Sequence, residues 1–278
     1  MGIRPVDKAT VNAYDKGMES LQSPGAVIPD GPVKDKAGTM TGRAVGRRPA
    51  QPPQPRGLRR GSLTPALIVK ESLRLLDSDT GFSLPKLGRA LGADPTAVYR
   101  HFPSKDDLVL AIADALIEEA TAGVSLQDCW VDTLAESARR LRRTYLAHPA
   151  AAALSACRTT QRPAEMRIVN VIIGAVRAAG FEGAEAAVVY RSVGDFALFW
   201  SGGEASFWAL DEKAQQTDRA AWTRAYLVAS EDEFPHIFAV RDELAKVADD
   251  DIFETILSLV LAGLIRRAPR PCDCGSHE

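Results

Sequence analysis

The sequence predicts an all-α protein in which a small three-helix domain is followed by a larger helical domain. Apolar residues recur three and four positions apart from about residue 64 to residue 266, the period of an amphipathic helix. Glycine and proline fall between these apolar periods, and strand-like alternation is missing. Hydrophobic residues make up 46% of the 278 residues, which is enough for a sizeable core.

Changes in composition divide the chain into four segments. We expect a disordered extension rich in proline and arginine over 1–60, a first domain over 61–105, a second over 106–267 and a flexible tail over 268–278. Six arginines and no acidic residue lie between Gly42 and Gly61. This stretch is interpreted either as a solvated tail or as a basic arm that reaches phosphates or a minor groove.

Composition also excludes several classes of protein. The formal net charge of −2 excludes a chain that is basic throughout, and four cysteines are too few for a disulfide scaffold. No run approaches eighteen consecutive apolar residues, so we expect no membrane span. A soluble cytoplasmic protein with reduced thiols is the expected class.

The first helix is expected over about 64–78. Thr64 followed by Pro65 is a good N-cap and first-turn pair. One apolar stripe is predicted to consist of Ala66, Val69, Leu73 and Leu76.

Two short helices follow the first. Ser83 can cap the second helix, which ends at Gly92. Asp94-Pro95 starts the third helix, over 95–102. The predicted inward-facing residues of the pair are Leu84, Leu87, Leu91, Val98 and Phe102. Two short helices joined by a glycine-centred turn are the layout of a helix-turn-helix, here at about 82–102.

The outward residues of the third helix suit a DNA duplex. Thr96 and Ala97 are small enough to let the helix enter a major groove, where a hydroxyl or a methyl group can meet a base edge. Arg100 suits either a phosphate or a guanine.

Phosphate contacts are expected at the edges of the same surface. Tyr99, His101 and Lys105 are suited to phosphate oxygens. Residues 56–105 hold nine Lys and Arg against four Asp and Glu, a local excess of positive charge typical of a DNA-binding domain.

A fourth helix opens directly after this unit. Ser104 and Asp107 fit a capping box, and Leu108, Ile112 and Ala115 share one face. Because the helix follows immediately, it can shift the reading unit when the rest of the protein moves.

The stretch 82–105 resembles the TetR family of transcriptional regulators. Val98-Tyr99-Arg100-His101-Phe102, with the following Ser104-Lys105, is similar to the family's signature. The likeness covers about 60–118, and a looser likeness runs from Phe234-Pro235-His236-Ile237 to Leu264.

The resemblance implies a DNA-binding homodimer with phosphate and base contacts at the positions described above. The expected DNA-binding residues are Ser83, Lys86, Thr96, Ala97, Tyr99, Arg100, His101 and Lys105. Pro85 stands where family members often carry a longer polar side chain, which leaves one common contact without its usual residue. Repression, with release from the operator by a small-molecule effector, is implied by the resemblance alone.

In the second domain, helices are expected at about 126–146, 164–179, 184–209 and 250–266, among six in all. The last is apolar on most of its circumference, so it must be buried on two sides. We expect a symmetric dimer around 184–209 and 250–266, with an imperfectly palindromic operator. The alternative is that both are core helices of a monomer. Ser201-Gly202-Gly203 indicates a kink or close packing.

The aromatic residues of this domain predict an effector pocket, because such sites are mostly apolar. The candidate ligand-binding residues are Trp130, Tyr145, Phe196, Phe199 and Trp200. Ordinary core aromatics are the alternative for each of them.

No metal, cofactor or catalytic activity is expected. Cys272, Cys274 and His277 supply three ligands where a zinc site needs four, and His148 and His236 are isolated. No nucleotide-binding loop, nucleophile elbow or zinc-protease motif is present. The competing functional class is an all-α ligand-binding or scaffold protein without specific DNA binding.

Overall fold

The computed structural model describes residues 63–78, 81–156 and 158–271, all of which lie in one compact unit, residues 53–278. The predicted extension 1–60, with its basic segment, and the Cys272, Cys274 and His277 cluster lie outside the described residues. Within the described ranges every regular element is a helix, so the prediction of an all-α fold is confirmed.

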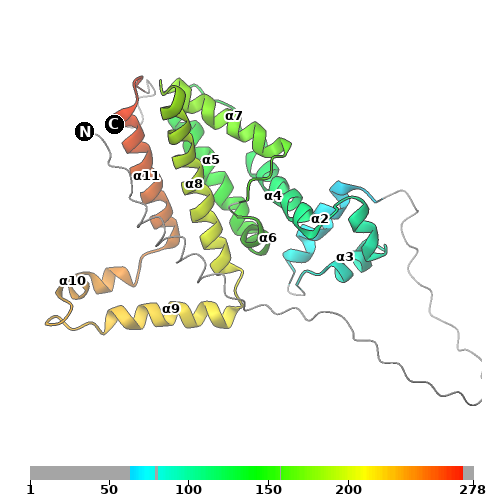
Figure 1. Cartoon of the computed structure of the whole chain (residues 1–278). Helices are drawn as coiled ribbons and strands as arrows, with labels where there is room; N and C mark the ends of the chain where they lie inside the picture. The colour runs from blue at the N-terminus through cyan, green and yellow to red at the C-terminus, as the bar shows by residue number, and fades with distance from the viewer. Residues whose placement is uncertain (1–62, 79–80, 157, 272–278) are drawn as a thin grey trace, which may run out of the picture. The chain divides into compact units, whose positions relative to one another are not determined.

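Figure 1 labels the elements in chain order. They are α2 (Pro65–Leu76), α3 (Leu84–Ala90), the 3₁₀ helix η1 (Pro95–Arg100), α4 (Lys105–Thr121), α5 (Trp130–Ala147), α6 (Pro149–Ser155), α7 (Pro163–Ala178), α8 (Gly183–Trp208), α9 (Glu212–Leu227), α10 (Pro235–Leu244) and α11 (Asp249–Arg267).

Local capping signals set the starts of the first helices. The Thr64 hydroxyl accepts a hydrogen bond from the Leu67 amide at 3.2 Å, and the Ser83 hydroxyl accepts one from the Lys86 amide at 3.4 Å. At α4 the Asp107 amide donates to the Ser104 hydroxyl, and the Asp107 carboxylate accepts from the Ser104 amide. The predicted caps and the capping box are therefore confirmed.

The predicted apolar stripe of α2 is wrong in part. Leu76 is buried, but Ala66 is exposed, and the other two predicted positions are half-buried. Ile68 and Leu75 are buried instead, because they offer more apolar surface than Ala66. Ser72 lies between them and is also buried, since its hydroxyl donates to the Ile68 carbonyl oxygen at 2.8 Å.

One hydrophobic core runs through the described residues, and α4 joins its two ends. α4 packs against α2 on one side and against α5, α6 and α7 on the other. α5 packs in turn against α8 and α11, and the rings of Phe196 on α8 and Phe253 on α11 are stacked 5.8 Å apart. α4 therefore contacts both the first and the second domain.

The sequence did not predict α6, α9 or α10. α6 is a short alanine-rich helix. α9 and α10 pack against each other, and neither contains a buried residue. Periodicity is a weak signal where a helix buries no face in its own chain.

No helix in the described ranges has both the length and the apolar character needed to cross a membrane.

Candidate nucleic-acid interface

The turn between α3 and η1 is held by two glycines. Gly92 has φ +59, a conformation that favours glycine. A Cβ at Gly88 would lie 2.9 Å from Pro95 Cγ, so a larger residue there would push η1 away from α3. The Ala93 amide donates to the Gly88 carbonyl oxygen at 2.9 Å and closes the turn. These contacts fix the position of η1 against α3.

η1 turns one face to the core and the opposite face outward. Val98 and Phe102 are 1% and 4% exposed, as the sequence predicts. The His101 and Phe102 amides both donate to the Val98 carbonyl oxygen at 3.0 Å, which tightens the end of the helix. The buried side chains of Val98 and Phe102 hold η1 against the core.

The predicted DNA-binding residues gather around this outward face. Thr96, Tyr99 and Arg100 are exposed on η1, while Ala97 and His101 are half-buried beside them. Lys105 is exposed at the first position of α4. The assignment of these residues to bases and phosphates stays a prediction.

Ser83 and Lys86 lie at the start of α3, and both are half-buried. The Ser83 hydroxyl is occupied as a helix cap, and Lys86 Nζ donates to the Gly81 carbonyl oxygen at 3.3 Å. Their DNA-binding role also stays a prediction.

A small cavity of about 80 Å³ lies among α4, α5, α7 and α8. Its walls are mostly aliphatic. Its polar groups are Thr121, Ser137, Arg158, Glu165 and Tyr190. Burial raises the pKa of the Tyr190 phenol, because the surrounding apolar groups disfavour the phenolate.

In the described part of the chain, this wall includes none of the five predicted ligand-binding aromatics. Trp130 and Tyr145 are buried in the core, and Phe199 is 54% exposed. Phe196 stacks on Phe253, and Trp200 is half-buried. Their ligand role stays a prediction. The lining of the cavity consists mostly of aliphatic residues from four separate helices. The sequence prediction considered aromatic residues only and therefore missed them.

His148 connects the end of α5 to the first domain. Its Nδ1 lies 2.8 Å from an oxygen of Asp77, the residue that ends α2, and its Nε2 lies 3.3 Å from an oxygen of Glu119 on α4. His148 also precedes α6 directly. Sequence reasoning treats this residue as isolated, because its two partners are distant in the chain.

α6 is pressed against α8. A Cβ at Gly202 would overlap the methyl group of Ala156, so Gly202 serves close packing, one of the two alternatives left open by the sequence. A Cβ at Gly203 would meet no atom within 4 Å. Because α6 also contacts α2 and α4, it connects α8 with the first domain.

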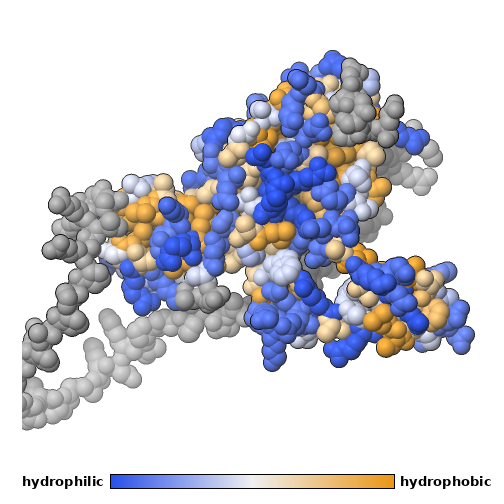
Figure 2. Space-filling view, turned by 180° about the vertical axis from the view of Figure 1, so that it is seen from behind, coloured by the Kyte–Doolittle hydropathy of each residue, from blue (hydrophilic) through white to orange (hydrophobic). Residues whose placement is uncertain are grey.

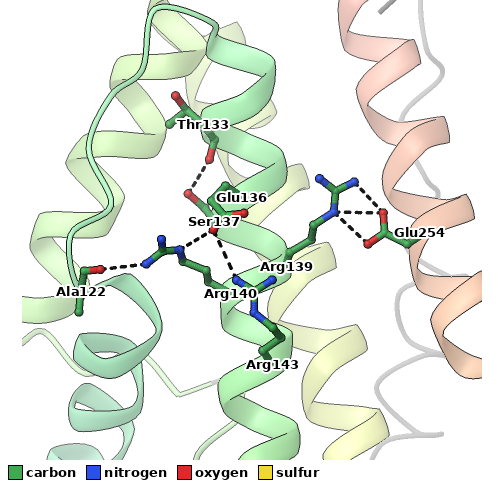
Figure 3. Close-up of polar contacts among 8 residues, drawn as sticks. All are labelled: Ala122, Thr133, Glu136, Ser137, Arg139, Arg140, Arg143 and Glu254. Carbon is green, nitrogen blue, oxygen red and sulfur yellow. Dashed lines mark hydrogen bonds and ion pairs between the residues drawn. The ribbon is translucent and has the colours of Figure 1, made fainter. Parts of the chain in front are cut away.

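Arginines of α5 tie the second domain together. Arg142 donates to both carboxylate oxygens of Glu204 on α8 at 2.7 Å and to Asp250 on α11 at 2.6 Å. Figure 3 shows the neighbouring Arg139, which holds Glu254 of α11 at 2.7 to 3.1 Å, and Arg140, which donates to the Ala122 carbonyl oxygen. α5 is thereby linked to α8, to α11 and to the segment after α4.

Two family models match the chain, one in each domain. Residues 80–112 match the model described as bacterial regulatory proteins, tetR family. Residues 125–267 match the tetracyclin repressor-like, C-terminal domain.

Known proteins agree with these models. An HTH-type transcriptional regulator from Saccharopolyspora erythraea is 30% identical over 69% of this chain and 82% of its own length. The class A tetracycline repressor protein from transposon 1721, from Escherichia coli, is 27% identical over 74% of this chain and 92% of its own length. A solved TetR regulator from Streptomyces coelicolor has 26% identity and a TM-score of 0.60, covering 75% of this chain and 100% of that one. With the helix-turn-helix and the helical second domain already described, the chain belongs to the TetR family of DNA-binding transcriptional regulators.

Proposed function

We propose that the chain is a homodimeric repressor that occupies an imperfectly palindromic operator and leaves it when a small apolar or amphipathic molecule binds the second domain. The observation that carries this proposal is the outward face of η1, where exposed polar and cationic side chains lie over the buried Val98 and Phe102. The name of the tetracycline repressor relative supports repression. Operator binding places the protein in the cytoplasm.

In this proposal residues 61–105 form the reading domain. Thr96 and Ala97 meet base edges, since they are the smallest outward residues of η1. Tyr99, His101 and Lys105 contact phosphates, and Arg100 serves a phosphate or a guanine.

The dimer is proposed to form through α8 and α11, within the domain 106–267. α11 buries Phe253, Leu257, Leu261 and Leu264 along one stripe against its own chain. Apolar side chains also stand exposed, with Leu259 at 66% on α11 and Val188 at 64% on α8. A second subunit would cover such surfaces. Twofold pairing then presents two η1 segments to half-sites about one helical turn apart.

Release is proposed to start at the cavity among α4, α5, α7 and α8. Its volume of about 80 Å³ is below the roughly 300–1,000 Å³ of typical ligand sites. A ligand of ordinary size therefore requires the four helices to separate. α4 is one of them, and it begins at Lys105, directly beyond η1. The ligand favours the conformation with the larger cavity, and the spacing of the two reading domains changes with it.

The test begins with mobility-shift titrations of the full chain at two salt concentrations. We expect specific binding to fall steeply with salt and to outcompete random duplex. Tyr99→Ala and Lys105→Ala should weaken binding to all sequences, whereas Thr96 and Ala97 variants should alter preference. Lys70→Ala, an exposed lysine on α2, is the control.

Light scattering of the same samples tests the dimer. A monomer without preference for any duplex would contradict the proposal and favour a ligand-binding or scaffold protein. If the four variants behave like the wild-type protein, the assignment of DNA-contacting residues is wrong.

A further inference from the structure

The chain itself fixes the direction in which the Thr96 hydroxyl can form hydrogen bonds. Thr96 Oγ1 lies 2.5 Å from Oδ1 of Asp94, and the Thr96 amide nitrogen lies 2.8 Å from the same oxygen. The pKa of Asp94 lies below its ordinary value, because the Thr96 hydroxyl and then the Thr96 amide donate to its carboxylate. An ionised carboxylate only accepts, so the hydroxyl proton of Thr96 must point at Asp94.

The remaining hydrogen-bonding capacity of this pair is therefore acceptor capacity. Thr96 Oγ1 keeps its lone pairs, and Oδ2 of Asp94 accepts no hydrogen bond from the residues that the structure describes. Both side chains are exposed beside the outward face of η1. An unrestrained threonine hydroxyl rotates to donate or to accept, and this one cannot donate elsewhere while Asp94 holds it.

We propose that Asp94 determines the base specificity of Thr96, so that the pair selects a base with an amino group in the major groove, cytosine before adenine. The inference rests on the proposed placement of Thr96 at a base edge. Cytosine N4 and adenine N6 donate in the major groove, whereas guanine and thymine present acceptor oxygens there. An acceptor placed against another acceptor is left without a partner and is disfavoured.

The order of the two amino-bearing bases follows from their neighbouring atoms. Adenine carries the acceptor N7 beside its amino group, and cytosine carries no acceptor on its major-groove edge. Two acceptors on the protein side, from Thr96 and Asp94, therefore fit cytosine better. Carboxylates also pair with cytosine N4 in known DNA interfaces.

The test selects bound duplexes from a random pool with the full-length wild-type protein, Thr96→Val and Thr96→Ser. Valine has the shape of threonine without the hydroxyl, and serine keeps the hydroxyl without the methyl group. We expect one position in each half-site at which the wild-type protein selects a C·G pair before an A·T pair, in one fixed orientation. Thr96→Val should lose roughly three- to tenfold of that preference, and Thr96→Ser should keep it.

Asp94 variants give a second measurement. In Asp94→Asn the amide oxygen still accepts from the Thr96 hydroxyl, so the preference for an amino-bearing base should remain. The amide nitrogen that replaces Oδ2 donates, so adenine, which has the acceptor N7, should gain relative to cytosine. In Asp94→Ala the hydroxyl is free to donate to guanine O6 or thymine O4, so these bases should enter at the same position. Thermal unfolding and binding to random duplex are measured for each variant, because Asp94→Ala also removes the cap of η1.

The outcomes separate this inference from the proposed function. If the wild-type protein selects no sequence, the proposed operator binding fails. If it selects a palindrome but Thr96→Val gives the same base frequencies at every position, the inference alone is overturned. A position at which Asp94→Ala keeps the wild-type base pair in the same orientation overturns it as well.

Discussion

α5 and α9 are helices of similar length in opposite environments. Of the 18 residues of α5, eleven are buried, and the helix packs against α4, α6, α7, α8 and α11. None of the 16 residues of α9 is buried, and its packing partner is α10. Figure 2 shows apolar surface on the α9–α10 pair. α5 is held by side chains from the whole core. α9 depends on its own backbone, on α10 and on the contacts of Gln215 and Arg219 with the end of α8, which makes it marginal as a helix in water.

Hydrogen exchange should show the largest difference between the two helices. We expect the interior amides of α5 to exchange at least about a thousandfold more slowly than those of α9, because α5 opens only with the core. Mass spectrometry of peptides from the full chain measures both at once. Equal protection would mean that another surface, such as a second subunit, covers α9.

Matched tryptophan variants should differ in stability. Trp130 on α5 is 3% exposed and Trp222 on α9 is 48% exposed. Trp130→Ala should lower the free energy of unfolding by about 3–5 kcal/mol, because it leaves a cavity in the core. Trp222→Ala should cost about 1 kcal/mol, chiefly its ring contact with Tyr226. Urea unfolding at fixed protein concentration measures both variants. Similar losses of unfolding free energy would contradict the proposed difference between α5 and α9.

Arg142 tests how α5 holds its neighbours. Arg142→Ala leaves the Glu204 carboxylate, whose side chain is 9% exposed, without its guanidinium partner. We expect a loss of about 3 kcal/mol in unfolding free energy. Arg143→Ala on the same helix is the control, with an expected change within about 0.5 kcal/mol, since its side chain is 63% exposed. An unchanged stability of Arg142→Ala would mean that the ion pairs of Arg142 do not hold α8 and α11 against α5.

The smallest effect is expected at the exposed pair of Arg139 and Glu254, drawn in Figure 3. The Arg139 guanidinium lowers the pKa of Glu254 below its ordinary value by donating hydrogen bonds to it. The pair therefore stabilises the fold above the ordinary glutamate pKa, and this contribution is lost as pH falls through the lowered value. We expect less than about 1 kcal/mol. Glu254→Gln should flatten this part of the pH profile of unfolding, and an unchanged profile would contradict the assignment.

The first domain could be predicted closely because its signals are local. Thr64, Ser83 and Ser104 cap helices within three residues of their own positions, and Val98 and Phe102 are spaced by one helical turn. The error at Ala66 arose because two interleaved apolar stripes share α2 and tertiary packing chooses between them.

The second domain could be predicted only as a set of helices. The small cavity is formed by residues from four helices, and the partners of His148 lie 71 and 29 positions away in the chain. Contacts between residues so far apart in the chain depend on the angles at which helices pack. The apolar periodicity of a single helix does not encode these angles. The acceptor character of Thr96 required its distance to Asp94, since the residue types alone allow a cap without a bonded hydroxyl.

If the proposed release mechanism holds, the small cavity among α4, α5, α7 and α8 has a consequence for a search for inducers. A molecule that fills about 80 Å³ without moving the walls would favour the conformation with the small cavity, so it would oppose such inducers. A larger molecule binds more weakly, because part of its binding free energy is used to separate the helices. Weak binders found in a screen should therefore also be tested for release of DNA. The order of such compounds by binding affinity should therefore differ from their order by potency in releasing the operator.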